Sequence, residues 1–340
     1  MKTSESVTPS HPDKLCDRIS DAILDACLEQ DPMSRVAIET MGGHGIITIT
    51  GELTTKAYVN VHDVVRCIVG HRYGIQTNIV QQSPEIANGV DTGGAGDQGI
   101  MTGYACRDNE AMIPHEHYLA RELAKFIYKK YPYDGKTQIT IDENKVITKI
   151  VASFQNVSKE DLYKTVIEWL GDSDGLSDED ILCNPAGDWN IGGFEADTGL
   201  TGRKLMVDNY GPQIAIGGGC FSGKDATKVD RSGAYMARKI AVDMLKADPE
   251  AKEVTVKIAY AIGVAEPVML TANIDGKEVD VKNAVATPKG IIEFLDLRKP
   301  QFSKTAEWGH FGNGLRGINE LVLICQYNTD ILCRHLVLTR

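Results

Sequence analysis

The sequence lacks paired cysteines, long apolar runs and an apolar leader. Its eight cysteines include no C-x-x-C pair, so neither a zinc ribbon nor a disulfide framework is indicated, and reduced thiols are expected. No run of about 18 apolar residues is present. The opening residues, MKTSESVTPSHPDK, lack the apolar core of a signal peptide. We therefore predict a cytoplasmic protein with no membrane partner.

Positive charge is also scarce: the sequence has 36 Lys and Arg residues and 47 Asp and Glu residues, which gives a net charge of -11. General nucleic-acid and membrane-surface binders need broad basic patches, so no nucleic-acid partner is expected. A hydrophobic content of 42% and a charged content of 24% are ordinary for a globular protein, and 340 residues suffice for two or three domains. Local basic groups on this acidic background are therefore informative.

Glycine and basic residues come together at residues 217–235, GGGCFSGKDATKVDRSGAY. Consecutive glycines let backbone N–H groups turn toward an anion without interference from Cβ atoms. Lys224 and Lys228 can neutralise phosphate oxygens. Asp225 and Asp230 are hard oxygen ligands of the kind that Mg²⁺ prefers. A glycine-rich turn with solvated charges is the plainer interpretation of any one residue, but the combination favours a polyphosphate site.

The same segment matches G-x-x-x-x-G-K, the first seven positions of a P-loop, from Gly218 to Lys224. The apolar residues 214–216 could form the strand that precedes such a loop. The eighth position decides against a P-loop, because Asp225 stands where Ser or Thr would bind Mg²⁺. Helical periodicity also resumes only near Asp230. We therefore predict a different triphosphate-binding loop.

Helical and strand patterns alternate in three rounds, each a helix, a β-hairpin and a second helix. The first round comprises a helix from Pro12, strands 35–40 and 46–52, and helix 61–69. The second comprises helix 116–130, strands 136–142 and 146–155, and helix 159–170. The third comprises helix 231–245, strands 253–261 and 267–273, and a shorter helix near residues 281–286.

This repetition predicts an α+β fold of three similar modules around a common core, because each pair of amphipathic helices needs a sheet face to cover. The expected modules span approximately residues 1–92, 93–194 and 195–340. Glycine-rich segments lie between the rounds or just before them, and loops on a rigid scaffold are where binding residues usually lie.

Several segments taken together resemble one known family. They are TSESVTPSHPDKLCDRISDAILDA from Thr3, GAGDQG from Gly94, DTGLTGRKLMVDNYG from Asp197, GGGCFSGKDATKVDRS from Gly217, YAIGVAEP from Tyr260 and GHFG from Gly309. In these segments the chain resembles the S-adenosylmethionine synthetases, or methionine adenosyltransferases. The hexapeptide GAGDQG and the sequence GGGCFSGKD are highly specific to that family. The resemblance implies a pseudo-threefold arrangement of the three modules.

The resemblance implies that the adenosyl group of ATP is transferred to the sulfur of L-methionine, and that the released triphosphate is hydrolysed to pyrophosphate and phosphate. It also implies two Mg²⁺ ions per site and K⁺ as activator. A thioether sulfur has no proton to lose, so the first step needs no base. The site must instead align the sulfur with C5′ and stabilise charge on the leaving triphosphate.

Roles for individual residues are implied by their positions in the family's motifs. The catalytic residues would be His11, Lys136, Arg203, Lys224 and Lys228. The ATP contacts would be His11, Asp134, Lys136, Ser153, Gln155, Trp189, Asp197, Arg203, Lys204, Lys224, Lys228 and Ile262. The methionine contacts would be Glu52, Gln82, Asp97, Asp197 and Lys228. Asp13 and Asp230 would bind Mg²⁺, and Glu39 would bind K⁺.

Three of these residues have plainer interpretations as well. His11 could simply be a residue that begins a helix, Glu39 could be a solvated strand residue, and Trp189 could be a core residue. In the family interpretation, Trp189 stands where a Phe is usual and stacks on adenine, with Ile262 on the opposite side. Ser10, Phe154 and Asp188 also depart from the family pattern, but none of these departures removes a charged catalytic group.

The resemblance further implies a homodimer with shared active sites, which in the family is commonly paired into a tetramer. It places the methionine contacts of the first module and the later triphosphate contacts on opposite subunits. The segment between Gln82 and Gly94 is shorter than the lid of longer relatives, and the region after Arg316 matches the family poorly.

Two alternatives belong to different functional classes. A P-loop NTPase or another ATP-using enzyme would release ADP, which the adenosyl transfer does not produce. A catalytically inactive regulatory relative would be expected to lose charged site residues, whereas this chain retains every one that can be aligned.

Overall fold

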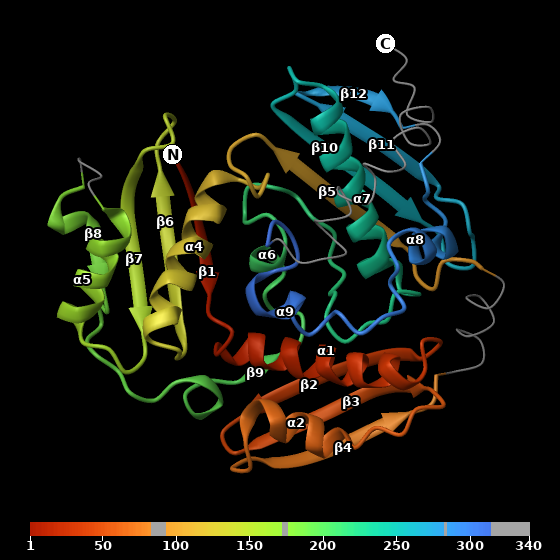
Figure 1. The fold of residues 1–340 in the computed structure, drawn as a ribbon, viewed down its shortest axis with the longest axis horizontal. Coiled ribbons are helices and arrows are strands. Elements are labelled where there is room, and N and C mark those ends of the chain that lie inside the picture. Colours follow the sequence, from red (N-terminus) through yellow and green to blue (C-terminus); the bar gives the residue numbers. More distant parts are fainter. Residues whose placement is uncertain (83–92, 172–175, 282–283, 314–340) are drawn as a thin grey trace.

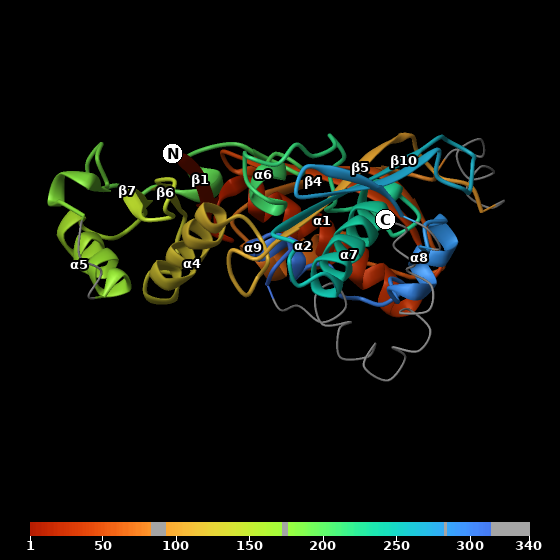
Figure 2. The same ribbon diagram turned by 90° about the horizontal axis from the view of Figure 1, so that it is seen from above.

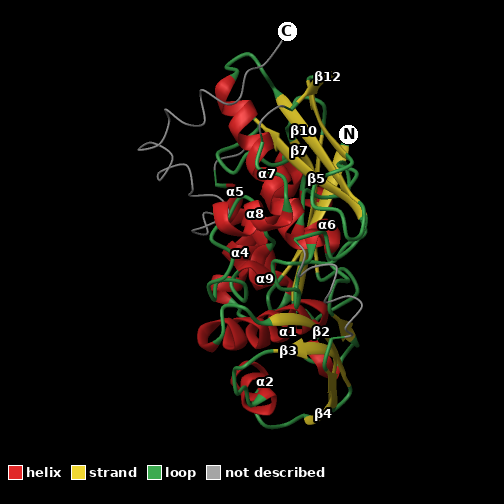
Figure 3. Ribbon diagram, turned by 90° about the vertical axis from the view of Figure 1, so that its right-hand side faces the viewer, coloured by secondary structure: helices red, strands yellow, loops and turns green. Residues whose placement is uncertain are grey.

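The computed structural model describes residues 1–82, 93–171, 176–281 and 284–313. The expectations about a short lid and about the region after Arg316 fall mainly on residues 83–92 and 317–340, outside these ranges. Three modules surround a central region that contains α6 (Leu205–Asp208) and α9 (Thr305–Trp308) (Figure 1). The sheets lie toward one side of the molecule and the long helices toward the other (Figures 2 and 3).

The first module is the sheet β4-β3-β2-β9, which is covered by α1 and α2. Its elements are α1 (Pro12–Gln30), β2 (Arg35–Gly43), β3 (Ile46–Thr54), α2 (Val61–Val69), β4 (Gly74–Val80) and β9 (Gly199–Leu200). The side chain of His11 caps α1, and Pro12 follows in the first turn, where a missing N–H is tolerated. Alternate residues of β2, such as Ile38, are buried, which leaves Glu39 on the open face of the sheet.

The second module is the sheet β1-β6-β7-β8 with α4 and α5. Its elements are β1 (Lys2–Val7), α4 (His115–Lys130), β6 (Gly135–Ile141), β7 (Ile147–Phe154), α5 (Lys159–Leu170) and β8 (Ile181–Cys183), with a 3₁₀ turn at Asp178–Asp180. A second 3₁₀ turn, Gly193–Glu195, lies against α1 and β2 of the first module. Ser158 caps α5 by accepting a hydrogen bond from the N–H of Asp161, and Gly171 ends the helix with a φ of 61°.

The third module is the sheet β12-β11-β10-β5 with α7 and α8. Its elements are β5 (Gly99–Cys106), α7 (Val229–Ala247), β10 (Glu253–Tyr260), β11 (Met269–Ile274), β12 (Lys277–Asp280) and α8 (Pro288–Phe294). The predicted helix near residues 281–286 is wrong, since the described residues there are not helical. The helix starts later because Thr287 caps it and Pro288 occupies its first turn.

Each sheet includes a strand from a distant part of the chain. β1 pairs antiparallel with β6, β5 pairs with β10, and β9 pairs with β2. The three modules of the α+β fold are therefore joined by exchanged strands as well as by packing. This exchange brings the chain before α1 next to the start of β6, since the N–H of Thr8 donates to the carbonyl of Gly135.

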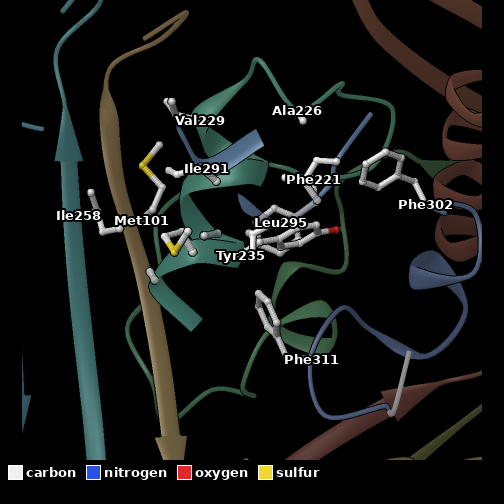
Figure 4. Packing of buried hydrophobic residues seen from close by; sticks show 14 of the residues in the cluster. Met101, Phe221, Ala226, Val229, Tyr235, Ile258, Ile291, Leu295, Phe302 and Phe311 are labelled. Atoms are coloured by element: carbon white, nitrogen blue, oxygen red, sulfur yellow. The ribbon is translucent and has the colours of Figure 1, made fainter. Parts of the chain in front are cut away.

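Buried apolar residues form one core shared by the first and third modules and a separate core in the second. The shared core contains a group of aromatic rings from α7, from the loop before it and from the C-terminal segment (Figure 4). The ring centroids of Phe221 and Tyr235 each lie 5.9 Å from the ring centroid of Phe311. This packing fixes the loop that precedes α7, which carries the predicted triphosphate residues.

Candidate active site

The residues predicted as site residues fall into two clusters. The first cluster surrounds the start of α1 and the adjoining ends of β6 and β7, and consists of His11, Asp13, Asp134, Lys136, Ser153, Gln155, Trp189, Asp197, Arg203 and Lys204. The second cluster lies where the loop before α7 meets β2, β3 and the hexapeptide, and consists of Glu39, Glu52, Gln82, Asp97, Lys224, Lys228, Asp230 and Ile262.

Ion pairs join the first cluster to the start of α1. Asp13 is 2% exposed, and its carboxylate lies 2.5 Å from Nζ of Lys204 and 3.5 Å from Nε of Arg203. It also accepts a hydrogen bond from the N–H of Leu200 at 3.0 Å. Although burial acts in the opposite direction, the hydrogen bonds from Lys204 and Leu200 lower the pKa of Asp13. Asp13 therefore holds two cations beside His11.

His11 is a buried, neutral residue of this cluster. Burial, followed by the positive charges of Lys204 and Lys136, lowers its pKa to about 3. Its Nδ1 accepts a hydrogen bond from the N–H of Asp13 at 3.2 Å, so the ring proton is on Nε2. The plainer interpretation of His11 as a helix-capping residue is thus confirmed, and the ring still has a free N–H to donate.

Three side chains of the second module complete the first cluster. Asp134 accepts a hydrogen bond from the N–H of Gly193 at 2.9 Å, and burial raises its pKa. Gln155 donates to the carbonyl of Asn190 at 2.9 Å. The half-buried ring of Trp189 and the amide of Gln155 both lie against Gly192. Trp189 is therefore a wall of this cluster and not a fully buried core residue.

The second cluster is organised by pairing of the loop with β2. Lys224 forms an antiparallel bridge with Ala37, and Ala37 pairs with Glu52 on β3. Directly opposed residues share a sheet face, so Lys224, Ala37 and Glu52 lie side by side. The expected placement of the first-module methionine contacts and the later triphosphate contacts on opposite subunits does not follow from this arrangement. Both kinds of residue meet in the second cluster.

The hexapeptide lies on the other side of this loop. Ala95 bridges to Ile262, and the N–H of Gly263 donates to the carbonyl of Ala95 at 2.8 Å. A Cβ atom on Gly219 would lie 2.2 Å from a carboxylate oxygen of Asp230, so only glycine allows this approach. Asp230 also binds Lys224 at 2.5 Å. The hexapeptide and the segment that begins at Tyr260, which are distant in sequence, thus form one wall of the second cluster.

The loop before α7 is not a P-loop. Residues 214–216 form no strand, and α7 begins at Val229, five residues after Lys224. Asp225 is 2% exposed, and its carboxylate accepts hydrogen bonds from the N–H groups of Val36 (2.7 Å) and Thr227 (2.9 Å) and from Lys228. Asp225 is therefore used to anchor the loop.

The carboxylates fit a metal that is held partly by a substrate. Within the described ranges, no three His, Cys, Asp or Glu residues converge on one point. Asp13 and Asp230 each offer one carboxylate, and a hollow of about 20 Å³ beside Asp230 is lined by Thr102 and Asn209 together with glycine and apolar residues. Such a space holds about one water molecule. Mg²⁺ commonly binds through one or two carboxylates together with substrate phosphates.

Four buried charged residues near the clusters were missed in the sequence analysis: Lys14, Asp17, Asp21 and Arg231. For Asp17 and Asp21 the available signal is the spacing of aspartates along α1, which recur at every fourth residue from Asp13 to Asp25. Such spacing places side chains on one helix face.

No helix in the described part of the chain is long and apolar enough to cross a membrane.

Comparison with known proteins covers all three modules. The models of the N-terminal, central and C-terminal domains of S-adenosylmethionine synthetase match residues 1–87, 92–189 and 191–319. The S-adenosylmethionine synthase of Wolinella succinogenes is 42% identical over 364 residues, which cover 92% of this chain and 93% of the relative. The S-adenosylmethionine synthase of Nitratiruptor sp. is 43% identical with the same coverage.

Proposed function

This chain belongs to the S-adenosylmethionine synthase family and is a methionine adenosyltransferase, and we propose that each of its active sites is assembled from two subunits. One subunit would supply the first cluster and its partner the second. The substrates are ATP and L-methionine, and the products are S-adenosylmethionine, pyrophosphate and phosphate.

The observation that carries this proposal is the separation of Trp189 from Ile262. In the proposed role, these two side chains enclose one adenine ring. Trp189 follows β8 and Ile262 follows β10, and these strands lie toward opposite sides of the molecule (Figure 1). One ligand can contact both residues only if they come from different chains. A homodimer with two equivalent sites satisfies this requirement.

The open face of the first sheet supports self-association. Met41, Ile46 and Val80 are 43%, 37% and 56% exposed, whereas residues of β2 and β3 on the other face, such as Ile38 and Ile49, are buried in the core beside α1. Exposed apolar side chains on one sheet face are typical of an interaction surface. Glu39, the proposed K⁺ ligand, and Glu52 lie on the same face.

The cations of both clusters would act on the leaving triphosphate. Arg203, Lys204 and Lys136 come from the first cluster, and Lys224 and Lys228 from the second. Fixed cations stabilise charge that develops as the C5′–O bond breaks, and they need no reorganisation at that moment. The Nε2–H of His11 would donate to a triphosphate oxygen. Asp13 and Asp230 would hold Mg²⁺, which would supply further charge stabilisation on the phosphates.

The remaining contacts would orient the two reacting groups. Ser153, Gln155, Asp134 and Asp197 are proposed to hold the adenosine from the first cluster. Glu52, Gln82 and Asp97 are proposed to hold the methionine ammonium and carboxylate from the second. The sulfur and C5′ would then meet at the boundary between subunits, where holding them in line lowers the barrier to transfer.

Complementation between inactive variants tests the shared site. Arg203→Ala removes a residue of the first cluster, and Lys224→Ala removes one of the second. A heterodimer of the two has one site with both lesions and one intact site. Random mixing should therefore restore about a quarter of the wild-type activity.

The matched control is Gln82→Ala mixed with Lys224→Ala. Both lesions lie in the second cluster, so every site of the heterodimer carries one lesion and activity stays low. Differential tags would verify that heterodimers form. Verified Arg203→Ala and Lys224→Ala heterodimers without activity would disprove the shared site. Product analysis in the same assay should detect S-adenosylmethionine and no ADP.

A further inference from the structure

The first long helix, α1, carries four aspartates on one face, and each holds a different stretch of backbone. The aspartates are Asp13, Asp17, Asp21 and Asp25. Their N–H partners are, in the same order, Leu200 (3.0 Å), Gly202 (2.8 Å), Gly223 (2.8 Å) and the successive residues Gln301, Phe302 and Ser303 (2.8–3.1 Å). The first two stretches border the first cluster, and the third belongs to the second cluster.

Asp21 is the member of this row that contacts the loop of Lys224. Its side chain is fully buried, where an unpaired carboxylate would be costly. Arg231 neutralises it with two hydrogen bonds, of 2.6 Å and 2.9 Å. A buried ion pair contributes little net stability compared with apolar residues of similar size. The presence of this pair therefore calls for another explanation.

The other contacts of Arg231 supply that explanation. Nη1 also donates to the carbonyls of Phe221 (2.9 Å) and Lys224 (3.1 Å). The guanidinium lies 4.2 Å from the ring centre of Phe302, which Figure 4 shows beside the loop. Arg231 thus joins α1 to both ends of the turn that delivers Lys224. The turn also lies directly against β2: the N–H of Ile38 donates to the carbonyl of Gly223 at 3.0 Å, and only glycine fits there because a Cβ atom would lie 1.9 Å from the carbonyl oxygen of Ile38.

We propose that Asp21 and Arg231 are positioning residues for adenosyl transfer: together they set the backbone from which Lys224 reaches the triphosphate. This inference rests on the proposed function of Lys224. Both side chains are fully buried, so the pair acts on the triphosphate through the loop and not by direct contact. A displacement of about 1 Å at a reacting centre can cost ~100-fold in rate.

Arg231→Lys is the variant that separates positioning from folding. Lysine keeps the positive charge beside Asp21, but its single ammonium cannot bind the carboxylate and both carbonyls in the planar fork geometry of arginine. We expect a folded protein with a kcat at least tenfold lower. Its dissociation constant for tripolyphosphate, measured by calorimetry, should rise at least tenfold, whereas its KM for methionine should change less than threefold.

Asp25→Asn is the matched control on the same helix. It weakens a carboxylate that holds three N–H groups, but those groups belong to residues 301–303, outside both clusters. Its melting temperature should fall, while kcat and tripolyphosphate affinity stay within twofold of wild type. A loss of activity in this variant as large as in Arg231→Lys would mean that stability, and not positioning, controls the rate, and would overturn the proposal.

Lys224→Met distinguishes failure of this inference from failure of the proposed function. If Lys224→Met loses tripolyphosphate binding and a folded Arg231→Lys protein does not, the positioning role is wrong and the triphosphate role stands. If neither variant loses binding, the triphosphate role of Lys224 is wrong.

A double variant, Asp21→Asn with Arg231→Met, covers the case in which Arg231→Lys does not fold. It leaves no buried charge unpaired, and the same loss of tripolyphosphate affinity is expected. If neither of these proteins folds while Asp25→Asn does, the pair serves stability and the proposal is overturned.

Discussion

The two clusters differ in how tightly their charged groups are bound before any ligand is present. In the first, His11 and Asp13 are 5% and 2% exposed, and Asp13 holds two cations and a backbone N–H. In the second, Glu39 and Asp97 are exposed, and much of the wall is glycine-rich backbone. The first cluster is therefore fixed by the fold of one chain. The second pairs Lys224 and Lys228 with the buried Asp230 and Asp225 but leaves the adjoining sheet face open, which suits a region that is completed by another chain.

This difference shows two ways to prepare a site for a highly charged ligand. In fixed ion pairs the carboxylates keep the cations in place, but they also compete with the ligand for those cations. Open backbone and exposed carboxylates leave more freedom but must be ordered during binding, and this ordering costs free energy. The loop of Lys224 combines the two, because buried charges anchor its backbone while its lysine side chain stays partly exposed.

The largest expected effect comes from removing one cation from each cluster. Arg203→Ala and Lys224→Ala should each lower kcat by about 10²- to 10³-fold, equivalent to roughly 2.7–4 kcal/mol of barrier. Circular dichroism and melting temperature would verify that both proteins are folded. Near-normal turnover in one variant would show that only the other cluster binds the leaving triphosphate, and near-normal turnover in both would remove that role altogether.

A smaller effect is expected when the proposed metal carboxylates become amides. Asp13→Asn and Asp230→Asn should both raise the Mg²⁺ concentration needed for half-maximal activity, because a neutral amide is a weaker ligand for a hard cation. We expect the larger shift, about tenfold, for Asp230→Asn, because Asp230 borders the water-sized hollow. Mg²⁺ titrations of initial rate would measure both shifts, and an equal dependence in wild type and variants would make these carboxylates purely structural.

The smallest effect is a pH dependence of stability that is specific to the first cluster. The pKa of His11 is about 3 in the folded protein and 6.5 in the unfolded chain. Only the unfolded chain takes up this proton between those values, so stability decreases as the pH falls below 6.5. From pH 6.5 to pH 5.5 this contribution is about 1 kcal/mol.

Urea unfolding at both pH values, with wild type and His11→Gln, would measure this contribution. The difference in unfolding free energy between pH 6.5 and pH 5.5 should be smaller in the variant by about that amount. An identical pH dependence in the two proteins would contradict a buried, neutral His11, and with it the idea that the first cluster is fixed before ligands bind.

Local sequence patterns were enough to place most of the secondary structure. The predicted helix 61–69 coincides with α2, and helix 159–170 coincides with α5. Apolar spacing in such segments depends only on residues within a few turns of one another. The third module shows the limit, since the apolar pattern of residues 281–286 competes with the start signals Thr287 and Pro288, and the helix follows the latter.

The sequence alone determined the chemistry: glycines beside lysines and aspartates at residues 217–235 indicate a polyphosphate site, and the specific motifs indicate the family. Only the tertiary structure decided which residues share a cluster. β1 joins β6, and Glu52 comes to lie beside Lys224, through strand pairings between distant segments that local periodicity does not encode. The buried pair of Asp21 and Arg231 is likewise separated by 210 residues and is joined only when α1 packs against the start of α7. Such a pair can hold the loop of Lys224 only when it is buried, and it is buried only in the folded chain.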